Sequence, residues 1–104
     1  MRIEYFRELL TLVETENYLS AAETLHISQS TLSRHVMITE QYFGIKIFNR
    51  DVKHFSVTKS GEYLLRYAAE IVEMYDSYQK NLQTTEAVEA NAPPHTPTGE
   101  TSTI

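Results

Sequence analysis

The chain has 104 residues, 41% of them hydrophobic, with no cysteine and a formal net charge of −5. This length suits one small globular domain with a tail, and the lack of cysteine excludes disulfides and cysteine-ligated zinc. No apolar run approaches the roughly 20 residues of a membrane-spanning helix, and the N-terminus lacks the apolar segment of a signal peptide, so we expect a cytoplasmic protein without membrane contact.

Hydrophobic spacing predicts three short helices in the first half of the chain. The first covers residues 4–16, where apolar side chains recur at i, i+3, i+4 and i+7. That face holds Tyr5, Phe6, Leu9, Leu10, Leu12 and Val13. A second helix is predicted over residues 20–26, and a third from about Gln29 to Tyr42, with Ser28 as its N-cap and Gly44 just past its end. The shared core of this helix pair would hold Ala22, Leu25, Ile27, Leu32 and Val36.

Two short β-rich segments follow the third helix. They cover residues 45–50 and 55–58, and a polar connection over residues 51–54 separates them. Two strands and a loop at this place predict a wing beside the helix pair.

A long helix is predicted from near residues 59–62 to about residue 82. Its apolar side chains are spaced 4, 3, 4, 3 and 4 residues apart, the heptad pattern of a helix that pairs with a second copy. This dimerisation seam consists of Leu64, Ala68, Ile71, Tyr75, Tyr78 and Leu82. The alternative is a helix that only completes the core of its own domain.

Charge is unevenly distributed along the chain. Residues 28–60 hold five basic residues against two acidic ones, a net charge of +3, whereas residues 61–104 hold two basic residues against seven acidic ones. Because local charge determines how a surface attracts a polyanion, an acidic chain with such a basic segment remains compatible with DNA binding.

Three motifs resemble LysR-type transcriptional regulators. Residues 20–34, SAAETLHISQSTLSR, are similar to the family signature A-A-E-x-L-x-[IV]-[ST]-Q-x-x-[IL]-S-R, residues 44–50 to G-x-x-L-F-x-R, and residues 57–61 to L-T-x-x-G. The resemblance covers about residues 3–82. Within this range the sequence differs from the family pattern at a few positions. Leu19 stands where an N-cap Ser or Thr is usual, Thr39 where an apolar residue is usual, and Met37-Ile38 where Arg or Lys is frequent.

The resemblance implies a mainly α fold, a winged helix-turn-helix of three helices and a two-stranded wing, followed by a long linker helix that dimerises. We expect a DNA-binding domain over residues 1–60, the linker over residues 61–83, and a disordered Thr/Pro-rich tail over residues 84–104, which contain all three prolines and six threonines. Such regulators carry a larger effector-sensing domain after the linker, and this chain ends before it, so no small-molecule effector site is expected here.

The second helix of a helix-turn-helix enters the major groove of DNA with its first turns nearest the bases. The expected base-reading residues are Gln29, Ser30, Ser33 and Arg34. The expected contacts to the DNA backbone come from Ser28, Thr31, Arg50, Lys53 and His54. Three of these residues have an alternative role that does not involve DNA. Ser28 could be an N-cap, Arg50 could pair with an internal carboxylate, and Lys53 could be a solvated loop charge.

The predicted function is therefore sequence-specific binding of operator DNA by a homodimer at the bacterial nucleoid. A second hypothesis is an interaction protein that forms mixed dimers with a full-length regulator through its linker helix. No nucleophile elbow or phosphate-binding loop is present, so we expect neither enzymatic activity nor a cofactor. The histidines, His26, His35, His54 and His95, lack metal-ligand spacing and are expected at the surface or at helix ends.

Overall fold

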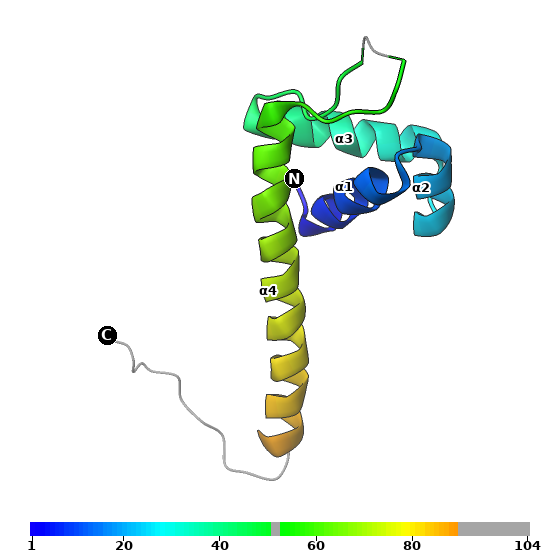
Figure 1. Ribbon diagram of the computed structural model, residues 1–104. Helices are drawn as coiled ribbons and strands as arrows, with labels where there is room; N and C mark the ends of the chain where they lie inside the picture. Colours follow the sequence, from blue (N-terminus) through cyan, green and yellow to red (C-terminus); the bar gives the residue numbers. More distant parts are fainter. Residues whose placement is uncertain (51–52, 90–104) are drawn as a thin grey trace. The chain divides into compact units, whose positions relative to one another are not determined.

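The structure, a computed structural model, describes residues 1–50 and 53–89. It contains four α-helices, α1 (Ile3–Thr15), α2 (Tyr18–Leu25), α3 (Gln29–Phe43) and α4 (Lys59–Glu89) (Figure 1). The chain divides into two compact units, Met1–Glu73 and Met74–Ile104, so that α1, α2, α3 and the first turns of α4 share one unit. The predicted mainly α fold, with a helix-turn-helix and a long last helix, is confirmed.

Side-chain and glycine caps set the ends of the helix pair. The Asn17 side chain accepts a hydrogen bond from the backbone N–H of Ser20 (2.9 Å), so α2 begins earlier than predicted and has a side-chain cap, although Leu19 stands where the family usually has Ser or Thr. Ser28 caps α3 by accepting from the N–H of Thr31 (3.0 Å). Gly44 ends α3 with φ at 69°, a left-handed conformation that glycine adopts without a Cβ penalty.

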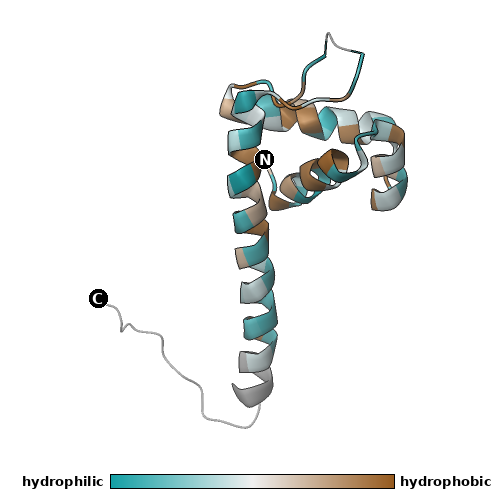
Figure 2. Ribbon diagram, viewed as in Figure 1, coloured by the Kyte–Doolittle hydropathy of each residue, from teal (hydrophilic) through white to brown (hydrophobic). Residues whose placement is uncertain are grey.

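The core lies where α1, α2 and α3 contact one another and where α4 begins. Figure 2 shows hydrophobic residues gathered on the inner sides of these helices. The buried apolar residues are Phe6, Leu9, Leu12, Ala21, Ala22, Leu32, Val36, Ile47, Phe48 and Ala68. Of the predicted core of the helix pair, Leu25 and Ile27 are only partly buried and pack against this cluster.

Within the described residues, one antiparallel bridge between Phe48 and Val57 joins the two segments of the predicted wing. Around it, the N–H of Asn49 donates to the carbonyl of Ser56 (3.1 Å), and the N–H of Thr58 donates to the carbonyl of Ile47 (2.9 Å). The paired segment is shorter than predicted because the Ile47 N–H donates to Glu40 of α3 and the Thr58 carbonyl accepts from the N–H of Glu62 in α4, so these two groups do not form the next hydrogen bond of a ladder. Residues 51–52 of the predicted loop lie outside the described residues.

Helix α4 begins at Lys59, where the N–H of Gly61 donates to the Thr58 hydroxyl (2.9 Å). It continues to Glu89, so the prediction of a disordered tail from residue 84 is wrong for residues 84–89, and residues 90–104 lie outside the described residues. No helix in the described part of the chain is long and apolar enough to cross a membrane.

Two residues of the predicted dimerisation seam belong to the core of the first unit. Ala68 is fully buried there and Leu64 packs against the same cluster. For this part of the helix the alternative of an internal core helix is correct. Ile71 and Tyr78 are exposed, and Tyr75 and Leu82 are half-buried.

Candidate DNA-binding surface

Three of the four predicted base-reading side chains lie exposed on the first turns of α3. Gln29, Ser30 and Arg34 are exposed, and Ser33 is half-buried. Met37 lies one turn further along the same outer face and is 47% exposed. It places an apolar side chain where the LysR-type regulators that the sequence resembles frequently have Arg or Lys. The N-terminal half of α3 thus offers amide, hydroxyl and guanidinium groups that hydrogen-bond base edges.

The hydroxyl groups at the start of α3 hydrogen-bond to one another. Ser28 Oγ accepts from the N–H of Thr31 and donates to Thr31 Oγ1 (2.8 Å), and it lies 3.2 Å from Ser30 Oγ. The N-cap alternative for Ser28 is confirmed. Capping occupies only part of the hydrogen-bonding capacity of Ser28 and leaves Ser30 exposed at the positive end of the helix dipole, where a phosphate is favoured.

A groove of about 380 Å³ brings α3 and the wing together. Its lining residues are Tyr18, Gln29, Ser33, Phe48, Asn49, Arg50, Lys53, His54 and Phe55. Five of them are predicted site residues from two separate segments, namely Gln29 and Ser33 of α3 and Arg50, Lys53 and His54 of the wing. One concave surface therefore combines groups suited to base edges with groups suited to phosphates.

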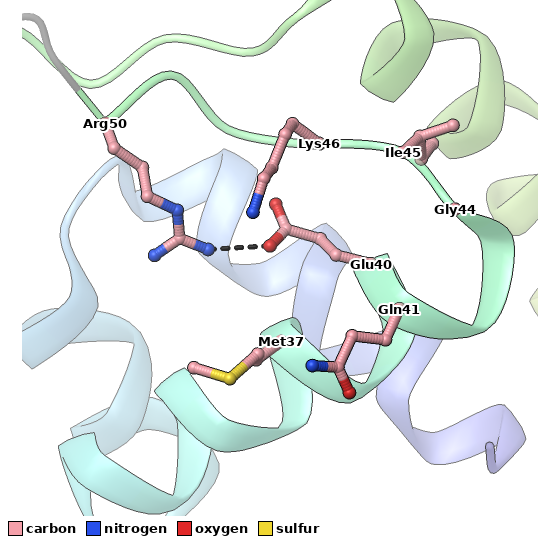
Figure 3. A pocket seen from close by; sticks show the side chains of 7 residues that line it. All are labelled: Met37, Glu40, Gln41, Gly44, Ile45, Lys46 and Arg50. Atoms are coloured by element: carbon pink, nitrogen blue, oxygen red, sulfur yellow. Dashed lines mark hydrogen bonds and ion pairs between the residues drawn. The ribbon is translucent and has the colours of Figure 1, made fainter.

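A buried carboxylate of α3 holds the base of the wing. Glu40 is 3% exposed and accepts from the N–H of Ile47 (2.7 Å), more weakly from the N–H of Phe48 (3.5 Å), and from Arg50 Nη2 (2.6 Å). Figure 3 shows this ion pair with Lys46 beside it, in a pocket of about 500 Å³. The alternative for Arg50, an internal carboxylate partner, is confirmed, while 44% of the Arg50 side chain stays exposed.

Tyr18, the first residue of α2, lies half-buried in the groove. Its ring meets the Phe48 ring edge-on, with the ring centroids 6.4 Å apart. Burial raises the pKa of the Tyr18 hydroxyl, against a smaller lowering by the Arg50 guanidinium and with a further rise from the Glu40 carboxylate. The hydroxyl therefore stays protonated at neutral pH and can donate a hydrogen bond.

One of the three described histidines, His35, departs from the expectation of a place at the surface or at a helix end. His35 lies partly buried inside the first unit, with Nδ1 2.7 Å from Glu8 Oε1 and its ring stacked on Tyr5 at a centroid distance of 4.1 Å. His26 is an exposed helix-end residue with φ at 61°, as predicted. His54 lines the groove, and His95 lies outside the described residues. Among the described residues, no group of three acidic or histidine side chains is placed to hold a metal ion.

Three residues that line or support this surface were not predicted from the sequence: Tyr18 and Asn49 line the groove, and the buried Glu40 supports the wing. Glu40 follows the buried Val36 by four positions, so helical spacing already places it on the apolar face of α3, where a carboxylate needs a partner. Asn49 donates from Nδ2 to Ser56 Oγ (2.9 Å) across the wing. No sequence pattern brings Tyr18 to the groove, because that placement depends on the packing of α2 against Phe48.

Comparisons with known proteins agree with this architecture. Residues 3–62 match the family described as "Bacterial regulatory helix-turn-helix protein, lysR family". The chain is 34% identical over 76 residues to the transcriptional regulator CysL of Bacillus subtilis, covering 73% of this chain and 25% of CysL. It is 32% identical over 72 residues to the regulator MetR of Haemophilus influenzae, covering 69% of this chain and 23% of MetR. The chain thus spans about a quarter of the length of these curated relatives.

Solved structures give the same result for the fold. Full-length OxyR from Pseudomonas aeruginosa, a C199D variant, superposes with a TM-score of 0.76 at 30% identity, covering 81% of this chain and 28% of OxyR. The BenM DNA-binding domain in complex with catB site 1 DNA superposes with a TM-score of 0.75 at 24% identity, covering 92% of this chain and all of that one. Since the family match alone extends over more than half of the 104 residues, the chain belongs to the LysR family of bacterial regulatory helix-turn-helix proteins.

Proposed function

We propose that this chain is a sequence-specific, double-stranded DNA-binding transcription regulator. The observation that carries the proposal is the groove that joins Gln29 and Ser33 of α3 to Arg50, Lys53 and His54 of the wing. Solved complexes of the BenM and CbnR DNA-binding domains with DNA share this fold and support the same use of it. A regulator of this kind acts on the chromosome, so we place it in the bacterial cytoplasm at the nucleoid.

In this proposal the exposed side chains of α3 read bases and the wing binds phosphates. The Gln29 amide matches the donor and acceptor of an adenine edge, and the Arg34 guanidinium matches guanine O6 and N7. Lys53 and His54 are exposed and reach the DNA backbone beside the groove. Glu40 is an acidic residue within the basic segment, where its negative charge would repel a phosphate. Because Glu40 is buried and paired with Arg50, this repulsion is reduced.

Two alanine variants separate base reading from phosphate binding. A duplex selected by the wild-type chain from a random pool, and a random duplex of equal length, are titrated by fluorescence anisotropy at several salt concentrations. Arg34→Ala is expected to lose about 1–3 kcal/mol of discrimination between the two duplexes, because one bidentate base contact is removed. Lys53→Ala is expected to weaken binding to both duplexes equally and to reduce the salt slope by about 1.

Lys80→Ala is the matched control for this titration, since Lys80 is an exposed lysine of α4 in the second unit. Its affinity and salt slope should equal those of the wild type. Equal wild-type affinity for the selected and random duplexes at physiological salt would contradict sequence-specific binding.

We further propose that α4 pairs two copies of the chain. The spacing of the predicted seam supports this for its members outside the core, and exposed apolar side chains accompany it in both units. In the first unit these are Tyr63, Tyr67 and Ile71, and in the second Met74 and Tyr78. Two paired copies would present two α3 helices to half-sites about one helical turn of DNA apart.

Charge placed on this helix is expected to weaken the dimer. Tyr78→Glu should raise the dimer dissociation constant by about tenfold or more, because a carboxylate replaces a 59% exposed aromatic ring that we place at the interface. Sedimentation equilibrium measures this, with Lys80→Glu as a control for added acidity. A wild-type chain that stays monomeric at all concentrations would argue against pairing, and native mass spectrometry after mixing with a longer LysR-type regulator from the same cell would detect mixed dimers.

A further inference from the structure

We propose that the Tyr18 hydroxyl and the Arg50 guanidinium together bind one phosphate of the DNA backbone in the groove between α3 and the wing. Both residues line this groove, and they come from segments far apart in the sequence. The inference rests on the proposed DNA-binding function and adds a subsite to it. It assigns a role to Tyr18, which no sequence motif points to.

The core fixes the position of the Tyr18 ring. The ring packs edge-on against Phe48, which is 4% exposed and also contacts the Phe55 ring at a centroid distance of 5.1 Å. A ring held this way loses little rotational freedom when its hydroxyl binds a ligand. Within the described residues, no side chain or backbone group hydrogen-bonds to the Tyr18 hydroxyl, so it remains available as a donor.

An ion pair with the Glu40 carboxylate fixes Arg50 (2.6 Å). The carboxylate binds only Nη2 of the guanidinium, and a guanidinium carries five N–H donors. Because Arg50 lines both the pocket of Figure 3 and the groove, the ion pair and a second ligand can occupy different edges of the same group. The ion pair with Glu40 thus orients Arg50 for phosphate without using up its hydrogen-bonding capacity.

The chemistry of the subsite favours a phosphate over a base edge. A phosphate oxygen is a charged acceptor, and a protonated phenol beside a guanidinium provides one neutral and one charged donor. Lys53, another cation that lines the groove, favours the same anion, and the His54 ring beside it can donate a hydrogen bond. Burial raises the pKa of the Tyr18 hydroxyl, which keeps its proton in place at neutral pH.

The test compares wild type with Tyr18→Phe, which removes the hydroxyl and keeps the ring that packs on Phe48. Anisotropy titrations use the duplex selected by the wild-type chain and a random duplex. We expect Tyr18→Phe to bind both duplexes about tenfold more weakly with unchanged preference between them, because a hydrogen bond to a charged group is lost from a backbone contact. Tyr42→Phe, which changes a 67% exposed tyrosine outside the groove, should bind as the wild type does.

A second measurement locates the phosphate. The selected duplex is prepared as a series in which one neutral methylphosphonate replaces each phosphate in turn. At one position the loss of affinity should be much smaller for Tyr18→Phe than for wild type, because the hydroxyl and the phosphate charge act on each other. Equal affinities of Tyr18→Phe and wild type, a loss confined to one base sequence, or additive losses at every position would overturn the subsite and leave the proposed function intact. Failure of the wild type to bind any duplex would overturn both.

Discussion

Replacing Glu40 with alanine is expected to lower the free energy of unfolding by about 2–4 kcal/mol. The substitution leaves the buried N–H of Ile47 without its 2.7 Å acceptor, which costs about 1–3 kcal/mol, and it also breaks the ion pair with Arg50. Loss of a fully buried ion-pair partner costs about 3–5 kcal/mol. Because Arg50 is 44% exposed, water can solvate its guanidinium again, so the two losses together stay below the sum of the costs for fully buried groups. Urea denaturation followed by circular dichroism measures the change at one fixed protein concentration.

Two further variants identify the cause of this loss. Glu40→Gln keeps an acceptor for the N–H of Ile47 but removes the charge that faces Arg50, so we expect it to lose about 1 kcal/mol. Glu23→Ala removes an exposed carboxylate from α2 and should stay within about 0.5 kcal/mol of wild type. If Glu40→Ala unfolded at the same urea concentration as Glu23→Ala, the carboxylate would not be what holds the wing to α3.

The parts of the fold that depend on neighbours in sequence could be predicted from the sequence. Ser28 and Gly44 fix the two ends of α3 through their own cap and backbone conformation, and both were predicted. Asn17 is a cap of the same kind, but the expectation placed the helix start at Ser20 and so overlooked it. The error there lies in treating Asn17 as part of a polar break, since an asparagine is as good an N-cap as the serine at position 28.

The parts that depend on distant contacts could not be predicted from the sequence. The residues of the wing have the β-rich composition of strands, yet the Ile47 N–H donates to the Glu40 carboxylate, and within the described residues one bridge forms. Heptad spacing likewise identifies a line of apolar residues, but it does not distinguish burial in the core of the same chain from burial against a second copy. It grouped Ala68, which lies in the core of its own unit, with Ile71, which is 41% exposed.

The same distinction applies to the candidate site. Gln29, Ser33, Lys53 and His54 were selected by their place in the motif or in the wing, and the structure brings them to one groove. Tyr18 reaches that groove only because α2 packs against Phe48. Arg50 has the internal partner that was one of its two expected roles, and its exposed edge leaves the other role open to experiment.

Gly61→Ala is expected to destabilise the first unit by about 2 kcal/mol, although alanine is the better helix former. A Cβ at Gly61 would lie 2.4 Å from the carbonyl oxygen of Ile47, 2.9 Å from its Cα and 2.9 Å from Val57 Cγ1. Overpacking costs about 1–3 kcal/mol, and the contact with backbone places this case at the upper end. The gain of about 1 kcal/mol in helix propensity offsets only part of it.

The Ile47 backbone cannot easily move away from such a Cβ. Its N–H donates to Glu40 and its carbonyl accepts from the N–H of Thr58 (2.9 Å), so the first turn of α4 would have to withdraw from the wing instead. Gly61→Val should therefore be worse than Gly61→Ala, because its γ-carbons extend further into the same backbone.

Gly44→Ala is the matched control, since it makes the same substitution for a different physical reason. Gly44 has φ at 69° and a Cβ there would meet nothing within 4 Å, so the expected loss is the left-handed strain of about 1 kcal/mol, which Gly44→Asn should partly relieve. Urea midpoints of the four variants test this order. A Gly61→Ala chain at least as stable as wild type would show that α4 can start without close contact to Ile47, and the link from Glu40 through the wing to α4 would then be unnecessary for the fold.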